Sequence, residues 1–116
     1  PVLVGIAEPR MNFEKWSSFR WESMGFSFVS SNVPTGNSES LWVLKHDSVV
    51  VNSMLNDSQS LTLSCRCNNV SIAVTFVYAF NLYTRRHALW RSLADVSESM
   101  TSNWVIIGDF NTVLRP

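Results

Sequence analysis

Between residues 60 and 107 the hydrophobic period of the sequence changes twice, and this change limits the fold more than any other feature. Ser60–Cys67 and Val70–Ala79 have the alternation or apolar content of strands, and Tyr83–Met100 has the period of an amphipathic helix. Trp104–Ile107 is an apolar run typical of a buried strand. Strands interrupted by a covering helix are typical of layered folds, so we predict the α/β class.

The N-terminal part of the chain adds further elements to this order. Val2–Ala7 is a nearly continuous apolar run, which predicts a strand buried on both faces that ends at Glu8-Pro9. Asn12–Trp21 has aromatic residues at helical spacing and predicts one or two helical turns. The other expected elements are a short strand at Gly25–Ser30, a surface loop at Asn32–Ser40, and strands at Ser40–Lys45 and Ser48–Asn52.

Alternation within Ser60–Cys67 predicts a strand with one wet side. Leucines and both cysteines share one face, whereas Thr62, Ser64 and Arg66 share the other. Cys65 and Cys67 lie two apart in one strand, an arrangement that suits packing better than a disulfide. No second Cys or His pair has zinc-type spacing, so we interpret both as buried structural thiols, with a metal pair as the alternative.

Composition limits the classes of partner. The chain has 116 residues, of which 46% are hydrophobic, enough to fill the core of one small domain. Nine basic and nine acidic residues give zero formal charge, so any contact with nucleic acid must be local. There is no run of eighteen apolar residues and no pattern of a signal peptide. We therefore expect a soluble, intracellular protein with no membrane partner.

Polar residues stand at the ends of the three most apolar strands. Glu8 follows the first, Tyr78 is near the end of the long one, and Asp109 follows the last. Ligand sites in open α/β sheets gather beyond the carboxyl ends of strands. Two carboxylates together with the amide of Asn111 form a plausible set of oxygen ligands for Mg²⁺, and the chemistry that this set indicates is phosphoryl transfer.

Each of these residues also has a purely structural interpretation. Glu8 before a proline suits a solvated strand end, and Asp109 with Asn111 suits an Asx turn. Tyr78 suits a half-buried position in the core. Spacing alone leaves both interpretations open.

Four motifs resemble one family. Gly108–Asn111 (GDFN), after a strand that ends Val-Ile-Ile, resembles the signature of the endonuclease/exonuclease/phosphatase superfamily. Ala7–Pro9 resembles its strand-end glutamate segment in plant retrotransposons, and Phe76–Ala79 resembles the strand that carries its tyrosine. Arg85–Trp90 (RRHALW) resembles a helix start of plant LINE-type endonucleases. The resemblance extends from Leu3 to Leu114.

The resemblance implies a four-layer α/β sandwich of which residues 1–116 form a part. The family's first strand would precede Val2, and its C-terminal half would follow the GDFN loop. We therefore expect one mixed sheet with covering helices, whose inner face is bare at parts of Val70–Ala79 and Trp104–Ile107. An exposed apolar face predicts marginal stability and self-association.

The resemblance also assigns roles to the strand-end residues. Glu8 would hold the divalent metal, expected to be Mg²⁺, that polarises a phosphate oxygen. Asp109 would orient or deprotonate the attacking water, and Asn111 would hold the phosphate and nucleophile in line. Tyr78 would contact the scissile phosphate or the leaving group.

Three residues after the tyrosine are weaker candidates for DNA contact. Asn81 follows Ala79-Phe80, where related enzymes more often carry Val-Pro. Arg85 and Arg86 would meet DNA phosphates, and the alternative is a solvated helix start. The two histidines, His46 and His87, match no catalytic histidine of the family and are expected at the surface.

In intact relatives the implied function is a Mg²⁺-dependent endonuclease that nicks DNA for target-primed reverse transcription. A reverse transcriptase domain is then expected in the same polyprotein, with DNA as partner and a nuclear location for an active element. The C-terminal Asp-His pair of the family is missing, so the chain is expected to be inactive alone. The alternatives are a phosphatase or phosphodiesterase of the superfamily and a catalytically inactive remnant with at most a binding role.

Overall fold

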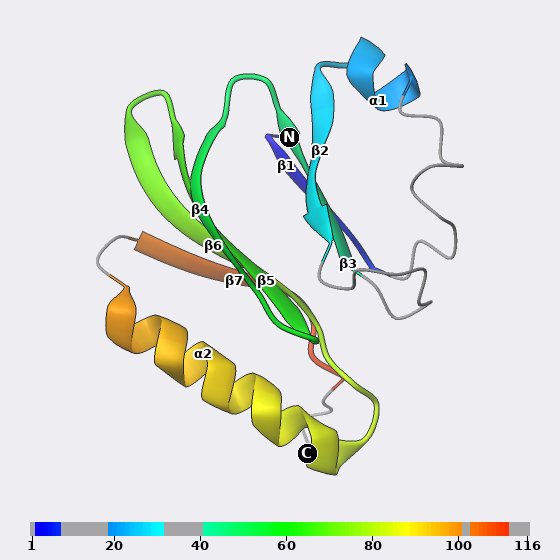
Figure 1. The fold of residues 1–116 in the computed structure, drawn as a ribbon, viewed down its shortest axis with the longest axis vertical. Helices are drawn as coiled ribbons and strands as arrows, with labels where there is room; N and C mark the ends of the chain where they lie inside the picture. Colours follow the sequence, from blue (N-terminus) through cyan, green and yellow to red (C-terminus); the bar gives the residue numbers. More distant parts are fainter. Residues whose placement is uncertain (1, 8–18, 32–40, 101–102, 112–116) are drawn as a thin grey trace, which may run out of the picture.

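A computed structural model describes residues 2–7, 19–31, 41–100 and 103–111 of the chain (Figure 1). The elements in chain order are β1 (Leu3–Ala7), α1 (Phe19–Ser23), β2 (Phe26–Ser31), β3 (Leu41–His46), β4 (Val50–Asn56), β5 (Ser60–Cys67), β6 (Val70–Tyr78), the 3-10 helix η2 (Tyr83–Arg86), α2 (His87–Ser99) and β7 (Asn103–Asp109). The predicted α/β class is confirmed. The expected loop at 32–40 and the helical turns before residue 19 lie outside the described residues.

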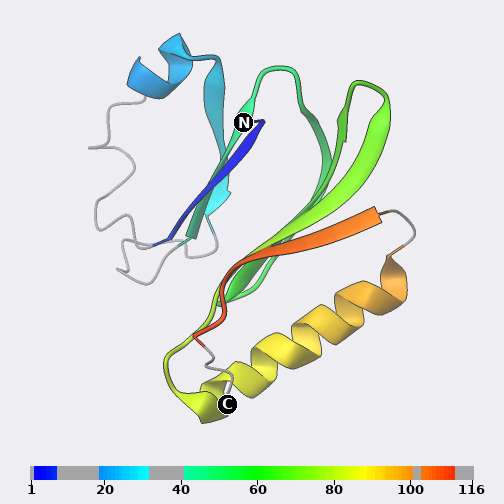
Figure 2. The same cartoon turned by 180° about the vertical axis from the view of Figure 1, so that it is seen from behind.

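The described strands form two sheets, where we expected one mixed sheet. Sheet A has the antiparallel order β1-β3-β2, and sheet B has the order β4-β5-β6-β7 with a parallel pair β6–β7. Helix α2 connects that parallel pair, as a crossover requires, and lies against sheet B on the side away from sheet A (Figures 1 and 2). Alternation predicts strands but does not say which strands pair, which is why the second sheet was not foreseen.

The main core lies between the two sheets. Its buried members are Leu41 and Val43 from β3, Leu61 and Leu63 from β5, and Phe76 from β6. A further contact brings β1 close to β6, because a Cβ added to Gly5 would lie only 2.4 Å from Cδ1 of Phe76. The absence of a side chain at Gly5 therefore permits the approach of the two sheets.

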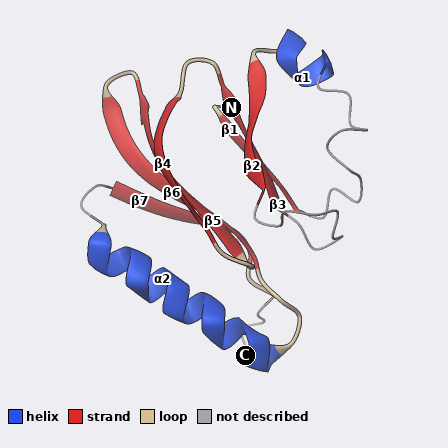
Figure 3. Cartoon of the chain, in the orientation of Figure 1, coloured by secondary structure: helices blue, strands red, loops and turns tan. Residues whose placement is uncertain are grey.

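A second apolar cluster joins sheet B to α2. Leu89 of α2 is buried against Val77 and Ala79, and Leu93 and Phe110 pack at its margin. The 3-10 turn η2 directly precedes α2, so the predicted helical segment is confirmed with a tighter first turn. Figure 3 shows α2 as one continuous helix alongside sheet B. Neither α1 nor α2 is long and apolar enough to cross a membrane.

The predicted wet side of β5 is wrong at its N-terminal end. Thr62 is buried, and its hydroxyl lies 2.7 Å from that of Thr75, which also accepts a 2.8 Å hydrogen bond from Nε1 of Trp104. Helix α2 lies over this end of the face, whereas Arg66 at the other end is exposed. A short run of threonine and serine thus gave the pattern of a solvent face where a helix packs.

The cysteines of β5 differ in burial. Cys65 is buried and Cys67 is half-buried, and both are free thiols. The Sγ of Cys65 lies 3.5 Å from the carbonyl oxygen of Ile72. Burial, and to a smaller degree the electrostatic influence of nearby Cys67, raises the pKa of the Cys65 thiol.

The expectation that β1 is buried on both faces is wrong, and so is the expectation that β7 is a buried strand. Both are edge strands. Residues of β1 are half-buried or exposed, and in β7 Val105, Ile106 and Ile107 are 46%, 38% and 54% exposed. The apolar surface expected to be bare is therefore present at Val105–Ile107, where the side chains of β7 are incompletely covered. It is absent at Phe76 of Val70–Ala79, because sheet A packs on that part of β6.

Candidate functional site

The carboxyl ends of β6 and β7 lie side by side. Tyr78 and Asp109 are the last residues of these strands and are partners in the parallel register. The amide of Ala79 continues the ladder, because it donates a 2.9 Å hydrogen bond to the carbonyl oxygen of Asp109. Paired residues of neighbouring strands share a face, so both side chains lie on the side of sheet B that faces sheet A.

The turn after β7 is built by the GDFN sequence. Gly108 has φ +148°, and a Cβ there would lie 2.0 Å from the carbonyl oxygen of Val77, so only glycine fits. Asn111 has a left-handed φ of 48°, which asparagine tolerates. Its amide nitrogen donates to Oδ1 of Asp109 at 2.9 Å, and its Nδ2 donates to the carbonyl oxygen of Ala79 at 2.5 Å. The turn therefore ties the end of β7 to the end of β6.

Asp109 lines an open groove between sheet A and the edge of sheet B. The groove has a volume of about 400 Å³. Its described lining residues are Leu3, Val4, Gly5, Ala7, Leu41, Phe76, Val77, Ile107, Gly108 and Asp109. The groove is thus mainly apolar, and Asp109 is the acidic residue among these lining residues. Ala7 is the last described residue before Glu8, which itself lies outside the described residues.

The structural interpretations of Asp109 with Asn111 and of Tyr78 both have support. The contact between the Asn111 amide and the Asp109 carboxylate is an Asx turn. Tyr78 is half-buried and packs against the core between the sheets, and its amide donates to the carbonyl oxygen of Gln59 at 2.9 Å. The structure brings Tyr78, Asp109 and Asn111 together at one sheet edge, while Asp109 also remains exposed in the groove.

The weaker candidates differ from one another. Arg86 is only 9% exposed, and its Nη1 donates to the carbonyl oxygens of Phe80 at 3.3 Å and Asn81 at 2.9 Å. Arg86 is therefore a buried residue that holds backbone carbonyls, which agrees neither with the expected contact to DNA phosphate nor with the alternative of a solvated helix start. Arg85 and Asn81 are exposed, and the Arg85 guanidinium lies over the Phe80 ring at 3.9 Å from its centroid. His46 is half-buried and His87 is exposed.

Two supporting residues were missed from the sequence. Gln59 is 1% exposed, its Oε1 accepts from the amide of Phe80 at 2.8 Å, and its Nε2 donates to the carbonyl oxygen of Arg85 at 3.0 Å. Trp90 of α2 stacks on Phe110, with ring centroids 6.0 Å apart and planes within 4°. Gln59 lies in a polar stretch that is typical of a surface turn, so its sequence carries no signal of this role.

The described residues supply a small set of oxygen donors. The backbone N–H of Asn111 donates to the carboxylate of Asp109, so the two residues are close together. A carboxylate and a side-chain amide oxygen are hard donors that suit Mg²⁺, which takes one or two carboxylates and keeps several waters. Within the described ranges no three residues of the types His, Cys, Asp and Glu gather as a metal site. A second carboxylate would have to come from elsewhere, and Glu8 follows the strand whose last residue lines the groove.

Solved structures share this fold. Humanized D. rerio TDP2 carrying 14 mutations matches with a TM-score of 0.74 at 13% identity, over 100% of this chain and 51% of that chain. The structure of D. rerio TDP2 complexed with single-strand DNA product gives 0.72 at 12% identity, over 100% and 49%. The human Nocturnin catalytic domain with bound sulfate gives 0.63 at 13% identity, over 97% and 52%.

These neighbours belong to the endonuclease/exonuclease/phosphatase superfamily. The chain therefore has the fold of part of that superfamily's α/β sandwich, and it spans about half the length of the solved structures that it matches. No family model and no curated protein sequence matches the chain. At such low identity the match shows the fold alone.

Proposed function

We propose that this chain is part of a metal-dependent phosphodiesterase that cuts the DNA backbone, of the kind carried by LINE-type retrotransposons. The observation that carries the proposal is the position of Asp109. It ends β7 beside Tyr78 and is exposed in a groove that the end of β1 also lines. Such strand ends hold side chains on rigid backbone, as catalysis of phosphoryl transfer requires.

Under this proposal each residue has a separate task. Glu8 and Asp109 would provide carboxylate oxygens for Mg²⁺, which when bound would stabilise charge on the phosphate. Asp109 also accepts a hydrogen bond from the Asn111 amide, which fixes the orientation of its carboxylate toward an attacking water. Asn111 is anchored to Ala79, and Tyr78 lies at the end of the neighbouring strand to contact the phosphate or the leaving group.

Two kinds of observation support the endonuclease branch. The Ala7–Pro9 and Arg85–Trp90 motifs resemble plant LINE-type endonucleases, and one solved neighbour is a complex with single-strand DNA. Arg85 is exposed, and Gln59 hydrogen-bonds both to its carbonyl oxygen and to the amide of Tyr78, so a phosphate near this strand end would be within the reach of the segment. Under the same proposal a reverse transcriptase domain belongs to the same polyprotein, and an active element acts in the nucleus.

The first test is metal binding, because it does not depend on a complete cleft. Mn²⁺, a paramagnetic substitute for Mg²⁺, should broaden the amide NMR signals of Ala7 and Asp109 in the wild-type chain. Glu8→Ala should weaken this effect strongly, whereas Glu98→Ala, which removes an exposed carboxylate from α2, should not. Equal broadening in the Glu8→Ala chain would contradict the proposed metal role.

The second test is nicking of supercoiled plasmid with Mg²⁺. Loss of nicking in both Glu8→Ala and Asp109→Ala, with activity retained in Glu98→Ala, would support the proposed function. Because the solved neighbours are about twice as long as the region that matches them, the same variants should also be compared in any longer protein that contains this chain. Nicking that survives both substitutions would exclude these residues from the reaction.

A further inference from the structure

The segment between β6 and α2 exposes large side chains. Leu82 is 61% exposed and Tyr83 is 67% exposed, and both follow Tyr78 within five residues. Large apolar side chains that gather at the surface beside a candidate site commonly mark a binding surface. We call Leu82, Tyr83 and Arg85 the Tyr83 surface.

The backbone below the Tyr83 surface is held firmly. Gln59 hydrogen-bonds to the segment at the Phe80 amide and at the Arg85 carbonyl. Arg86 donates to the Phe80 and Asn81 carbonyls, and its guanidinium lies 5.6 Å from the centroid of the Tyr83 ring. His87 makes an edge contact with the same ring at 5.2 Å. The exposed position of Tyr83 is therefore fixed by Arg86 within η2, by His87 at the start of α2, and by Gln59 through the backbone.

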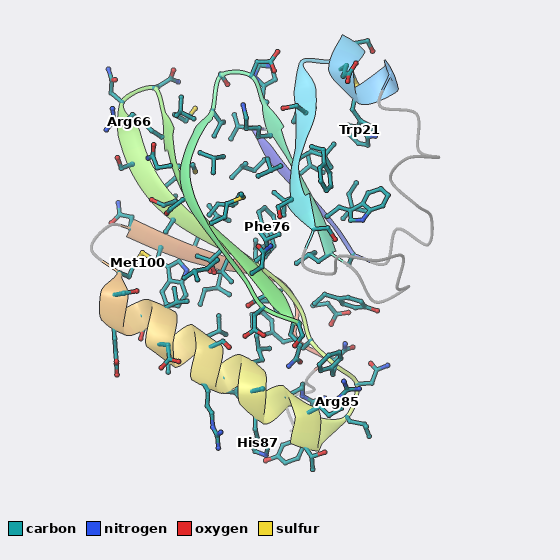
Figure 4. All side chains as sticks on the ribbon, in the orientation of Figure 1. Trp21, Arg66, Phe76, Arg85, His87 and Met100 are labelled. Carbon is teal, nitrogen blue, oxygen red and sulfur yellow. The ribbon has the colours of Figure 1, made fainter. Side chains whose placement is uncertain are left out.

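The charge of the segment differs from that of the whole chain. Residues 80–91 contain three arginines and a histidine and no acidic residue, although the chain as a whole has nine basic and nine acidic residues. Arg85 and His87 lie at the end of the molecule where β6 leads into α2 (Figure 4). The surface is thus locally cationic, which suits a phosphate backbone as partner.

The geometry of the arginine suits phosphate contact. The Arg85 guanidinium is stacked on the Phe80 ring at 3.9 Å, so its face is occupied while the residue remains exposed. A stacked guanidinium keeps its N–H donors in its own plane and can direct them at a phosphate. Tyr83 and Arg85, which are two residues apart, would then provide a ring on which a base can stack and a guanidinium that can bind the phosphate of the same strand.

We propose that the Tyr83 surface binds an unpaired nucleotide of a DNA strand, with the base stacked on Tyr83 and a phosphate bound by Arg85. The choice of DNA rests on the proposed function. A base can stack on an exposed ring only if its own face is free. Bases within a duplex are already stacked on each other, so an unpaired base is the suitable partner. Gln59 joins this segment to the end of β6, because its carbonyl oxygen accepts from the Tyr78 amide and its Nε2 donates to the Arg85 carbonyl oxygen. A nucleotide bound there would therefore lie beside the strand end that carries Tyr78.

The test is binding of a fluorescently labelled oligo-dT, measured by anisotropy in EDTA so that no cutting occurs. Tyr83→Ala should weaken binding about tenfold, as loss of one stacked base predicts, while Tyr83→Phe keeps the ring and should stay within about twofold. Leu55→Ala is the matched control, because Leu55 is equally exposed on β4 and should have no effect. An oligonucleotide of abasic sites should bind the wild type as weakly as oligo-dT binds Tyr83→Ala.

Salt dependence separates the two contacts. Arg85→Ala should lower the slope of log affinity against log salt by roughly 0.7, the value for one phosphate contact on a single strand, whereas Tyr83→Ala should leave the slope unchanged. Thermal melts of each variant exclude unfolding as the cause.

The inference would be overturned if Tyr83→Ala bound oligo-dT as well as the wild type, or if a blunt duplex bound as tightly as the single strand. Because the assay contains no metal, its result is independent of cutting. Base-dependent binding without Mn²⁺ binding or nicking would contradict the proposed function alone. Nicking without Tyr83-dependent binding would overturn this inference alone.

Discussion

Two apolar stretches of the chain, one in β3 and one in β7, differ in how far their side chains are buried. Leu41–Leu44 of β3 is at most 4% exposed, whereas Val105–Ile107 of β7 is 38–54% exposed. Strand β3 is central in sheet A and packs against the core between the sheets, but β7 is the edge of sheet B. The comparison teaches that an apolar run predicts a strand, while its place in the sheet order decides whether it is buried.

The largest effect is expected from a pair of substitutions that shorten one side chain in each stretch to alanine. Leu41→Ala should lower the free energy of unfolding by roughly 2–5 kcal/mol, because it opens a cavity in the core between the sheets. Ile107→Ala should cost less than about 1 kcal/mol, because its side chain is already half in solvent. Urea unfolding followed by tryptophan fluorescence measures both, and equal losses would contradict the assigned burial.

A smaller loss of stability is expected at Gly108 of β7, where the backbone conformation and not the burial of a side chain limits the residue type. Gly108→Ala should destabilise the chain by more than about 1 kcal/mol, since its Cβ would meet the Val77 carbonyl at a positive φ. Asn103→Ala, at the exposed start of the same strand, is the control and should change stability by at most about 0.5 kcal/mol. A Gly108→Ala chain as stable as the wild type would show that the strand relaxes freely.

The exposed edge of β7 also predicts self-association of the chain. Sedimentation velocity should show association that rises with concentration, because an apolar strand edge can pair with another copy. Ile107→Lys should reduce it, since a lysine on an edge strand opposes pairing. Leu55→Lys places the same charge on β4, the other edge of sheet B. A greater reduction by Leu55→Lys would assign the contact to β4.

The smallest expected effect is on the reactivity of the two cysteines of β5, of which Cys65 is buried and Cys67 is half-buried. Burial and the nearby Cys67 raise the pKa of Cys65 above its ordinary value of 9.0. The neutral thiol is therefore favoured by folding, and its contribution to stability is complete below pH 9.0 and is lost as the pH rises through the folded-state pKa.

Alkylation by iodoacetamide measures this difference site by site. Cys67 should react faster than Cys65 at pH 8, because Cys65 is buried and its raised pKa leaves little reactive thiolate at that pH. Mass spectrometry of the labelled peptides, with Cys65→Ala and Cys67→Ala as single-site references, separates the two. Equal rates at the two thiols would contradict the burial of Cys65.

Much of the local structure was predictable from sequence. The strand Ser60–Cys67 has the predicted bounds, and the helix over Tyr83–Met100 is present as η2 and α2. Local sequence also accounts for the turn after β7, because Gly108 and Asn111 adopt positive φ values that other residues avoid. Such features depend on the period of side chains along one element, which a sequence displays directly.

The arrangement of the candidate site was only partly predictable. Sequence order placed Tyr78 and Asp109 at strand ends, but not the parallel pairing that makes them neighbours. It also failed to show that Arg86 is buried against backbone carbonyls or that Gln59 holds the same segment. These contacts were not predictable because Gln59 and Arg86 lie in polar stretches of sequence that are typical of exposed segments.

By itself the sequence determined the α/β class, the order of elements and the residues at the strand ends, because these follow from local periodicity and turn chemistry. Tertiary structure alone decided that the strands divide into two sheets, that Thr62 is buried beside Thr75 on the face toward α2, and that Val105–Ile107 is exposed. The physical reason is that burial and hydrogen-bond partners depend on which elements meet in space. A strand's own residues state which faces are apolar, and only its neighbours determine what covers them.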